Sequence, residues 1–198
     1  MKKNDFSTAV KALKDGEPII YPTDTLYALG ADIYNETAVR KVYDIKRRPY
    51  SVPLPVAVGS IPAIETIANT NEASRKVSEM FLPGNLTIIL KKKQSVPDIV
   101  TGGSDSVAVR VPNDSIALKL LSQYGPLTIT SANIHHIKTL STIPDILRQL
   151  ETSIPVCLDD GKRAGTASTI VDVSAKEPQI VRKGSISEKE IMDVISHG

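Results

Sequence analysis

The segment Tyr21-Pro22-Thr23-Asp24-Thr25-Leu26-Tyr27-Ala28-Leu29-Gly30 places turn-forming residues directly after a short apolar run. Residues 18–21 predict a buried strand, and the Pro, Thr and Asp that follow predict the turn that ends it. Before this strand, the apolar spacing of residues 6–13 predicts a helix, and Gly16 is a stop signal after it. The chain therefore begins with a helix followed by a buried strand.

The same patterns predict the elements that follow. Helices are expected from the N-cap Asn35 to Lys46-Arg47-Arg48, over 61–67, 72–81 and 115–121, from Pro144 to 150, and from Ser187 onward. Strands are expected over 52–58, 86–90, 107–111, 127–130, 155–158, 169–173 and 179–181. Strands follow strands at two places, which favours an α/β fold of the α+β type with a mixed parallel and antiparallel sheet flanked by helices. No repeat or linker divides the chain, so a single domain over 1–198 is expected.

The composition is that of an ordinary globular protein. The 198 residues include 24 Lys and Arg against 22 Asp and Glu, 41% apolar residues and one cysteine. These values exclude a disordered chain, a disulfide framework and a cysteine-based zinc site. No apolar run is long enough to span a membrane, and no signal-type run follows the first residues, so we expect a cytoplasmic protein without a membrane partner.

Aromatic residues make up only 4% of the chain, which disfavours a nucleic-acid surface built on stacked aromatic rings. The net charge of +2 is small, but the cations occur in clusters at Lys46-Arg47-Arg48, Lys91-Lys92-Lys93, Lys162-Arg163 and Arg182-Lys183. A small net charge is therefore compatible with a local basic cleft.

Common catalytic and metal-binding patterns are missing from the sequence. His135 and His136 are adjacent and His197 is nearly terminal, so solvated histidines are favoured over a metal site. Cys157 lies in an apolar run, as a buried cysteine does, and Asp159, Asp160 and Asp172 are typical turn formers. The sequence contains no G-x-S-x-G, Walker A or G-x-G-x-x-G motif, so a nucleotide would be bound without a glycine-rich loop.

Three polar features are candidates for a binding site. Lys46 and Arg48 at a helix end complement the helix dipole, but they would also point the same way and could hold phosphate oxygens. The row Thr128 to Asn133 leaves a strand end, where hydroxyls either satisfy a turn or bind a ligand at a sheet edge. Arg110 stands between valines in a predicted strand and must face solvent, an acidic partner or an anionic ligand, because a buried unpaired arginine is costly.

Seven segments in order resemble the YrdC-like family, the threonylcarbamoyl-AMP synthases. They are 21–30, Lys46-Arg47-Arg48-Pro49 (K-x-R-P in the family), 83–87, 107–112, Thr130-Ser131-Ala132-Asn133 (S-x-N in the family), 168–172 and Arg182-Lys183-Gly184. Each segment is weakly specific, but all seven in this order are highly specific. The chain is similar to the short form of the family, which lacks an extra C-terminal domain.

The resemblance implies a single domain with a twisted mixed sheet around a basic concave cleft. It implies a nucleotidyltransferase that forms threonylcarbamoyl-AMP and pyrophosphate from L-threonine, bicarbonate and ATP, with Mg²⁺ accompanying ATP and no metal site of its own. The product would serve the threonylcarbamoyladenosine modification of tRNA. The implied partners are therefore a downstream threonylcarbamoyl transferase that receives the adenylate, and tRNA or double-stranded RNA.

The resemblance also implies roles for individual residues. Lys46 and Arg48 would be the catalytic residues that hold the phosphates. Further ATP contacts would come from Ser106, Ser131, Asn133, Ser141 and Arg182. L-Threonine would be held by Thr25, Arg110, Thr130 and Ser168.

The chain departs from the family pattern at several positions. Val52 and Ala57 replace an Asn and a His of the family's ligand site, Ala28 replaces a Gly, and His135-His136 replaces a small Ser-Gly pair. These changes leave open a diverged relative that acts on another carbamoyl compound. A basic cleft also leaves open a non-catalytic module that binds tRNA or double-stranded RNA through its backbone.

Overall fold

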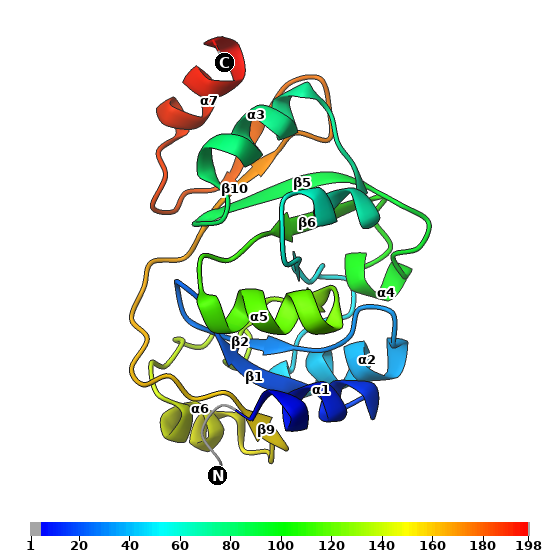
Figure 1. Cartoon of the computed structure of the whole chain (residues 1–198), viewed down its shortest axis with the longest axis vertical. Coiled ribbons are helices and arrows are strands. Elements are labelled where there is room, and N and C mark those ends of the chain that lie inside the picture. The colour runs from blue at the N-terminus through cyan, green and yellow to red at the C-terminus, as the bar shows by residue number, and fades with distance from the viewer. Residues whose placement is uncertain (1–4, 198) are drawn as a thin grey trace.

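The computed structural model describes residues 5–197 (Figure 1). Its helices are α1 (Phe6–Lys14), α2 (Glu36–Lys46), α3 (Glu72–Phe81), α4 (Asp98–Thr101), α5 (Ser115–Tyr124), α6 (Ile143–Leu150) and α7 (Glu188–His197), with a 3-10 helix η1 (Pro62–Thr66). Its strands are β1 (Ile19–Pro22), β2 (Tyr27–Gly30), β3 (Val56–Ala57), β4 (Ala68–Asn69), β5 (Leu86–Lys92), β6 (Ser106–Arg110), β7 (Leu127–Thr128), β8 (Thr130–Ser131), β9 (Val156–Cys157), β10 (Thr169–Asp172) and β11 (Gln179–Arg182).

The strands form two hydrogen-bonded sheets. The four-stranded sheet has the order β8-β2-β1-β9, and the seven-stranded sheet has the order β11-β10-β5-β6-β3-β7 with β4 added beside β5. Both sheets are mixed: β1 pairs antiparallel with β2 and parallel with β9, and β5 pairs antiparallel with β6 and parallel with β10. The predicted α/β fold with a mixed sheet is confirmed.

The two sheets meet at the crossing between β2 and β7. Asp32 and Leu127 form an isolated antiparallel bridge, and the Thr128 N–H donates to the Ala31 carbonyl at 2.9 Å. The buried Tyr21 hydroxyl donates to the Thr128 carbonyl at 3.0 Å. These contacts hold β1 of the smaller sheet against β7 of the larger one.

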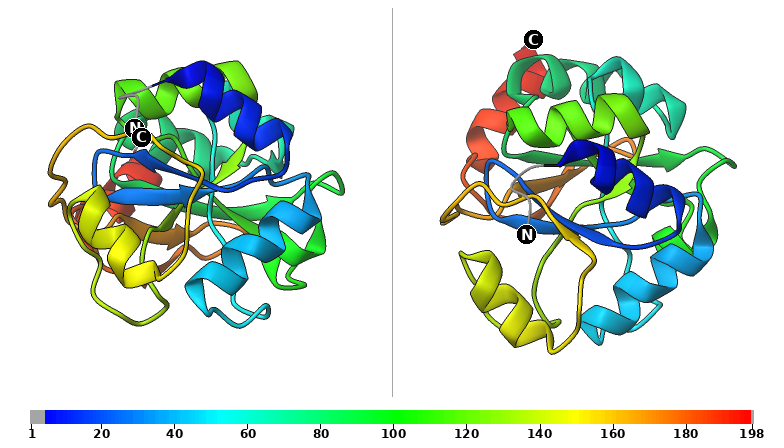
Figure 2. Two further views of the ribbon diagram at one scale, coloured as in Figure 1. Left: turned by 90° about the horizontal axis from the view of Figure 1, so that it is seen from below. Right: turned by 60° about the horizontal axis from the view of Figure 1, so that its bottom comes forward.

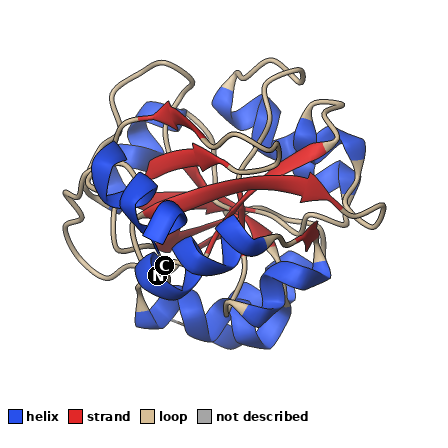
Figure 3. Ribbon diagram, turned by 90° about the horizontal axis from the view of Figure 1, so that it is seen from above, coloured by secondary structure: helices blue, strands red, loops and turns tan. Residues whose placement is uncertain are grey.

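Helices cover the faces of both sheets (Figures 2 and 3). Helices α1 and α5 contact each other and β1, while α3 contacts α7 and β5. One hydrophobic cluster takes residues from both sheets, among them Leu29 of β2 and Ile88 of β5. A second cluster joins α1 and α5 to β1 and β9. The core is mostly aliphatic, but it also encloses Tyr21, Tyr27 and Tyr43, the largest of the fully buried side chains.

Local sequence signals set the helix ends. The Asn35 side chain accepts from the Ala38 N–H at 3.1 Å, and the C-cap residue Arg47, which follows α2, adopts a left-handed conformation with φ of 51°. At α7 the Glu190 carboxylate accepts from the Ser187 N–H at 2.9 Å, and the Glu190 N–H donates to the Ser187 hydroxyl at 3.3 Å. The predicted N-cap of α2 is therefore confirmed, and so is the predicted start of α7 after Ser187, where the two bonds form a capping box.

The structure corrects several predicted strands. Residues 52–58 contribute only the two-residue strand β3, because Pro53 and Pro55 have no N–H to donate to a ladder. The strand predicted over 127–130 is divided into β7 and β8, since the Ile129 N–H donates to the Pro55 carbonyl at 2.8 Å. Strand β2 was not predicted, although all four of its residues are buried.

The segment 158–168 connects the two sheets along one side of the molecule, where it appears in yellow to orange in Figure 1. The Asp159 carboxylate accepts from the Gly161 N–H at 2.9 Å, which is the turn-forming role predicted for it. Further along, the Gly165 N–H donates to the Thr25 carbonyl at 2.8 Å. A Cβ at Gly165 would lie 2.5 Å from that carbonyl oxygen, so only glycine permits this approach.

A second close approach of two backbone segments, at Gly184, leads to a prediction about stability. A Cβ at Gly184 would lie 2.5 Å from both the Ala167 carbonyl oxygen and the Ser168 carbonyl carbon, which are backbone atoms that cannot move independently. We expect Gly184→Ala to lower the free energy of unfolding by about 3 kcal/mol, measured by urea denaturation. Gly103→Ala is the control, because its Cβ meets no atom within 4 Å and costs only its left-handed backbone, about 1 kcal/mol. Equal losses in the two variants would contradict the steric argument.

Candidate active site

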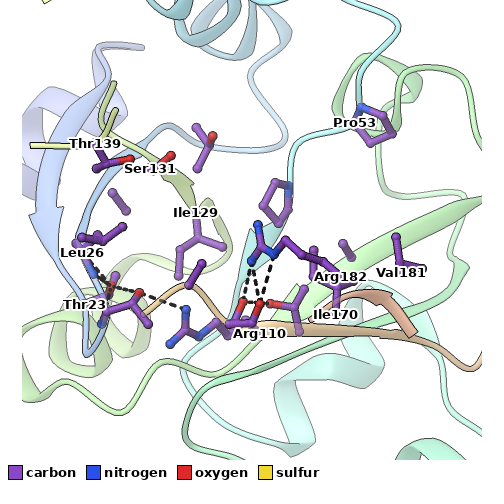
Figure 4. Close-up of a pocket in the computed structure, with 18 of the residues that line it drawn as sticks. Thr23, Leu26, Pro53, Arg110, Ile129, Ser131, Thr139, Ile170, Val181 and Arg182 are labelled. Atoms are coloured by element: carbon purple, nitrogen blue, oxygen red, sulfur yellow. Dashed lines mark hydrogen bonds between the residues drawn. The ribbon is translucent and has the colours of Figure 1, made fainter. Parts of the chain in front are cut away.

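A cavity of about 500 Å³ lies between the two sheets. Figure 4 shows Leu26, Ile129 and Ser131 on one side, Ile170, Val181 and Arg182 on the other, and Arg110 between them. The first side comes from the turn after β1 and from the β7–β8 region, and the second comes from β10 and β11. The cavity is thus built from both sheets and depends on how they are joined.

Most of the residues predicted for the site line this cavity. They are Thr25, Arg48, Arg110, Thr130, Ser131, Ser168 and Arg182. The other four predicted residues, Lys46, Ser106, Asn133 and Ser141, do not line it. Ser106 lies on β6, two and four residues before the lining residues Ala108 and Arg110, so it shares their face of the strand. The Ser141 carbonyl accepts from the Arg163 N–H at 2.8 Å.

Arg110 is buried at the centre of the cavity, with 4% of its surface exposed. Its Nη2 donates to Asp24 Oδ1 at 2.8 Å and to Asn85 Oδ1 at 2.7 Å, its Nε to the Gly84 carbonyl at 2.9 Å, and its Nη1 to Thr25 Oγ1 at 3.2 Å. Burial lowers the pKa of Arg110, and Asp24 opposes that shift. Of the partners considered for Arg110, the structure provides an acidic one, and the side chain also faces the cavity.

The turn after β1 is held by its own hydroxyl groups. Thr23 Oγ1 donates to the Leu26 carbonyl at 2.6 Å and accepts from the Leu26 N–H at 3.2 Å. Thr23 and Thr25 also share a hydroxyl–hydroxyl hydrogen bond of 2.9 Å. This network presents the Thr25 hydroxyl to the cavity beside Arg110.

Arg182 on β11 is oriented by Ser168. Its Nε and Nη2 donate to the Ser168 carbonyl at 3.1 and 2.8 Å, and Nη2 also reaches the Ser168 hydroxyl at 3.0 Å. That hydroxyl shares a 2.8 Å hydrogen bond with Thr87 of β5. Burial and the nearby Arg110 lower the pKa of Arg182. Among the described residues Arg182 Nη1 has no partner, so both of its N–H groups are available to a ligand.

Lys46 is the last residue of α2 and is 1% exposed. Its ammonium donates to the Ser131 carbonyl at 2.5 Å, to the Asn133 carbonyl at 2.7 Å and to Asn133 Oδ1 at 3.1 Å, which uses its three donors. Burial, followed by the charge of Arg48, lowers the pKa of Lys46 to about 7. Lys46 therefore ties α2 to the segment after β8.

Arg48 lies just beyond the end of α2 and lines the cavity. Its Nε donates to the Val52 carbonyl at 3.1 Å and its Nη2 to the Pro53 carbonyl at 2.7 Å, while Nη1 lies 3.3 Å from His135 Nδ1. Burial lowers the pKa of Arg48. Lys46 contacts Ser131 and Asn133, whereas Arg48 contacts Val52, Pro53 and His135. Only Arg48 lines the cavity, so the expectation that both cations point into one site is not met.

The sequence patterns missed the apolar walls of the cavity, formed by Leu26, Pro53, Pro55, Ile129, Ile170 and Val181. Nothing in their local sequence separates these residues from core residues, because their role depends on a gap between the sheets. Val181 differs from the others only in the structure, where it is 58% exposed on a strand at the edge of its sheet.

Other features of residues 5–197 bear on metal binding, nucleophilic catalysis and membrane insertion. No group of three or more His, Cys, Asp or Glu residues in this range could hold a metal ion. Burial raises the pKa of the Cys157 thiol to about 12, so the thiolate needed for nucleophilic attack is disfavoured. None of the helices described here has the length and apolar character needed to cross a membrane.

The structure defines an α/β protein whose cavity between two mixed sheets is lined by Arg48, Arg110 and Arg182. The Sua5/YciO/YrdC family model, described as "Telomere recombination", matches residues 11–184. The chain therefore belongs to this family, which confirms the resemblance of the seven sequence segments.

Individual relatives cover most of the chain. A protein of Methanocaldococcus jannaschii is 39% identical over 177 residues, which are 89% of this chain and 84% of that protein. The threonylcarbamoyl-AMP synthase of Pyrococcus abyssi is 34% identical over 186 residues, which are 92% of this chain but only 55% of that protein. The crystal structure of P. abyssi Sua5 complexed with L-threonine matches 96% of this chain and 57% of its own with a TM-score of 0.90 and 33% identity. The structure of E. coli YciO matches 94% of this chain and 92% of its own with a TM-score of 0.86 and 26% identity.

The buried ion pair between Arg110 and Asp24 predicts that removing its carboxylate destabilises the protein more than removing an exposed, paired carboxylate. Asp24→Ala would leave Arg110 charged and unpaired in a buried site, and we expect it to lower the free energy of unfolding by about 3–5 kcal/mol. Asp105→Ala is the matched control: its carboxylate meets Lys91 at 2.6 Å, but the Asp105 side chain is 74% exposed. We expect that control to lose less than about 1 kcal/mol. Urea denaturation of both variants measures the difference, and similar losses would show that Asp24 does not stabilise Arg110.

Proposed function

We propose that this chain is a threonylcarbamoyl-AMP synthase, a nucleotidyltransferase that uses L-threonine, bicarbonate and ATP. The observation that carries the proposal is the cavity in which Arg48, Arg110 and Arg182 lie among threonine and serine hydroxyls. Family membership supports it, and so does the likeness to a Sua5 structure that contains L-threonine.

The reaction places specific demands on such a cavity. The amine of threonine attacks the carbon of bicarbonate and water leaves, which gives a carbamate. A carbamate oxygen then attacks the α-phosphorus of ATP, and the bond from that phosphorus to the bridging oxygen breaks to release pyrophosphate. Carbamates are short-lived in water, so a sheltered site that holds both substrates accelerates the second step. Fixed cations stabilise the charge that develops on the phosphate oxygens.

The phosphates of ATP would lie near Arg48 and Arg182. Each of these guanidinium groups is anchored through carbonyl oxygens and keeps N–H groups that the described residues do not use. Oriented guanidinium donors suit phosphate oxygens because they can form paired hydrogen bonds. The Ser131 hydroxyl donates to Asn133 Oδ1 at 2.6 Å, and its oxygen is left to accept from the nucleotide.

L-Threonine would occupy the side of the cavity near Arg110. The hydroxyls of Thr25, Thr130 and Ser168 line this region together with the Arg110 guanidinium. Four of the five Arg110 N–H donors are engaged by Asp24, Asn85, Gly84 and Thr25, so one donor would remain for the threonine carboxylate. These hydroxyls would also bind the polar atoms of threonine and position its amine.

The lining residues include no Asp or Glu. The walls therefore do not fit a resident Mg²⁺, and we propose that the ion arrives on the triphosphate oxygens of ATP. We further propose a single domain, since one hydrophobic cluster takes residues from both sheets. A cytoplasmic location, a tRNA modification pathway with a downstream transferase, and contact with tRNA are proposed on the same functional grounds.

The proposal predicts threonine-dependent release of pyrophosphate from ATP in the presence of bicarbonate. We expect Arg48→Ala to reduce this rate by at least about 100-fold, because the reaction loses a cation on the phosphates. Its free energy of unfolding should change by less than about 1 kcal/mol, because the side chain is only half-buried. Arg47→Ala is the matched control, since Arg47 pairs with Glu151 on the surface and is 61% exposed.

A coupled pyrophosphate assay with and without L-threonine measures these rates. Wild-type protein that releases no pyrophosphate in response to threonine would overturn the proposed function. If Arg47→Ala and Arg48→Ala reduce the rate of pyrophosphate release equally, the assignment of Arg48 to the phosphates is overturned.

A further inference from the structure

His135, in the segment after β8, contacts Arg48. Its Nδ1 lies 3.3 Å from Arg48 Nη1, and it is not among the residues that line the cavity. Its own backbone N–H donates to the Lys46 carbonyl at 2.8 Å, which fixes the imidazole next to the end of α2. The histidine is therefore held in place by the same helix end that carries Arg48.

The chemistry of the contact determines the protonation of His135. A guanidinium has only N–H donors, so the Nδ1 atom must be the acceptor. Nδ1 then carries no proton, and the proton of the neutral ring lies on Nε2. A protonated His135 would lose this hydrogen bond and place a second positive charge beside Arg48.

The surroundings of His135 favour its neutral form. Its ring packs against His136 with centroids 3.8 Å apart and an interplanar angle of 36°. Burial lowers the pKa of His135, and the charges of Arg48, His136 and Lys46 lower it further. The packing and the hydrogen bond thus point to the same protonation state.

We propose that His135 is a positioning residue that orients the Arg48 guanidinium for the phosphates of ATP. This inference rests on the proposed function, in which Arg48 binds those phosphates. The Val52 carbonyl holds Nε, the Pro53 carbonyl holds Nη2 and His135 Nδ1 holds Nη1, so each nitrogen of the guanidinium has one acceptor. One N–H then remains on Nη1 and one on Nη2. This pair of donors matches two oxygens of a phosphate group.

His135 differs from the two carbonyl partners in one respect. The carbonyls of Val52 and Pro53 belong to the turn that follows Arg48, whereas His135 belongs to the distant segment after β8. It therefore couples the orientation of Arg48 to the segment that carries Ser131. Without it, the planar guanidinium would be held by two acceptors instead of three, and more of its ordering would have to be supplied at each ATP binding event.

The test compares three variants of the full chain. His135→Ala removes the acceptor, whereas His135→Asn retains an acceptor close to the position of Nδ1 and cannot become protonated. His197→Asn is the matched control, because His197 is exposed at the end of α7 and its ring contacts the Asp193 carbonyl of the same helix. Isothermal titration calorimetry with Mg·ATP and, separately, with L-threonine measures the affinities, and circular dichroism checks folding.

We expect His135→Ala to weaken ATP binding by about tenfold, because a preorganised donor becomes mobile. His135→Asn should restore ATP affinity to within about twofold of the wild type, and His197→Asn should match the wild type. Threonine affinity should be unchanged in all three variants. The inference is overturned if His135→Ala leaves ATP affinity unchanged or if His135→Asn does not recover that affinity. It is also overturned if the affinity for L-threonine falls as much as the affinity for ATP.

Measurements on the same proteins distinguish a failure of this inference from a failure of the proposed function. If the wild type binds ATP and the His135 variants follow the expected order, the inference stands even if no pyrophosphate is released. In that case only the proposed reaction fails. A wild type that binds no ATP would overturn both.

Discussion

The buried ion pair between Arg110 and Asp24 is the interaction on which the site depends. Arg110 belongs to β6 of the seven-stranded sheet, and Asp24 belongs to the turn after β1 of the four-stranded sheet. Only 5% of the Arg110 side chain and 15% of the Asp24 side chain are exposed. Removing two charges from water is costly, and the cost is offset only when the remaining donors are also bonded. The remaining Arg110 donors are bonded by Asn85, Gly84 and Thr25. The ion pair between Arg110 and Asp24 therefore fixes the base of the cavity and the distance between its walls.

Around this centre the cations have distinct roles that the net charge conceals. Lys46 is fully enclosed and directs all three of its donors at the segment after β8, which makes it part of the architecture of that segment. Arg48 and Arg182 are each anchored by carbonyl oxygens and retain N–H groups that face the cavity. The overall charge of +2 is thus compatible with three arginines that converge on one space of about 500 Å³.

Local signals in the sequence predicted most of the elements but not all of their limits. Asn35 and Ser187 identified helix starts because a cap depends only on the next three residues. Strand β2 escaped prediction because a short apolar run does not distinguish a strand from a buried loop, and its pairing with β1 decided the matter. The division of the strand at Ile129 depends on Pro55, which is distant in sequence. Contacts between segments far apart in the chain cannot be predicted from the local hydrophobic pattern.

The sequence by itself determined the class of the protein and the alternating faces of β6, and it identified seven of the residues that line the cavity. These follow from residue type, spacing and motif order, which are local properties. Only the tertiary structure decided that Arg110 pairs with Asp24, that Lys46 is enclosed while Arg48 lines the cavity, and that His135 contacts Arg48. Each of these facts depends on the approach of two segments far apart in the chain. That approach is set by the packing of two sheets around a shared core.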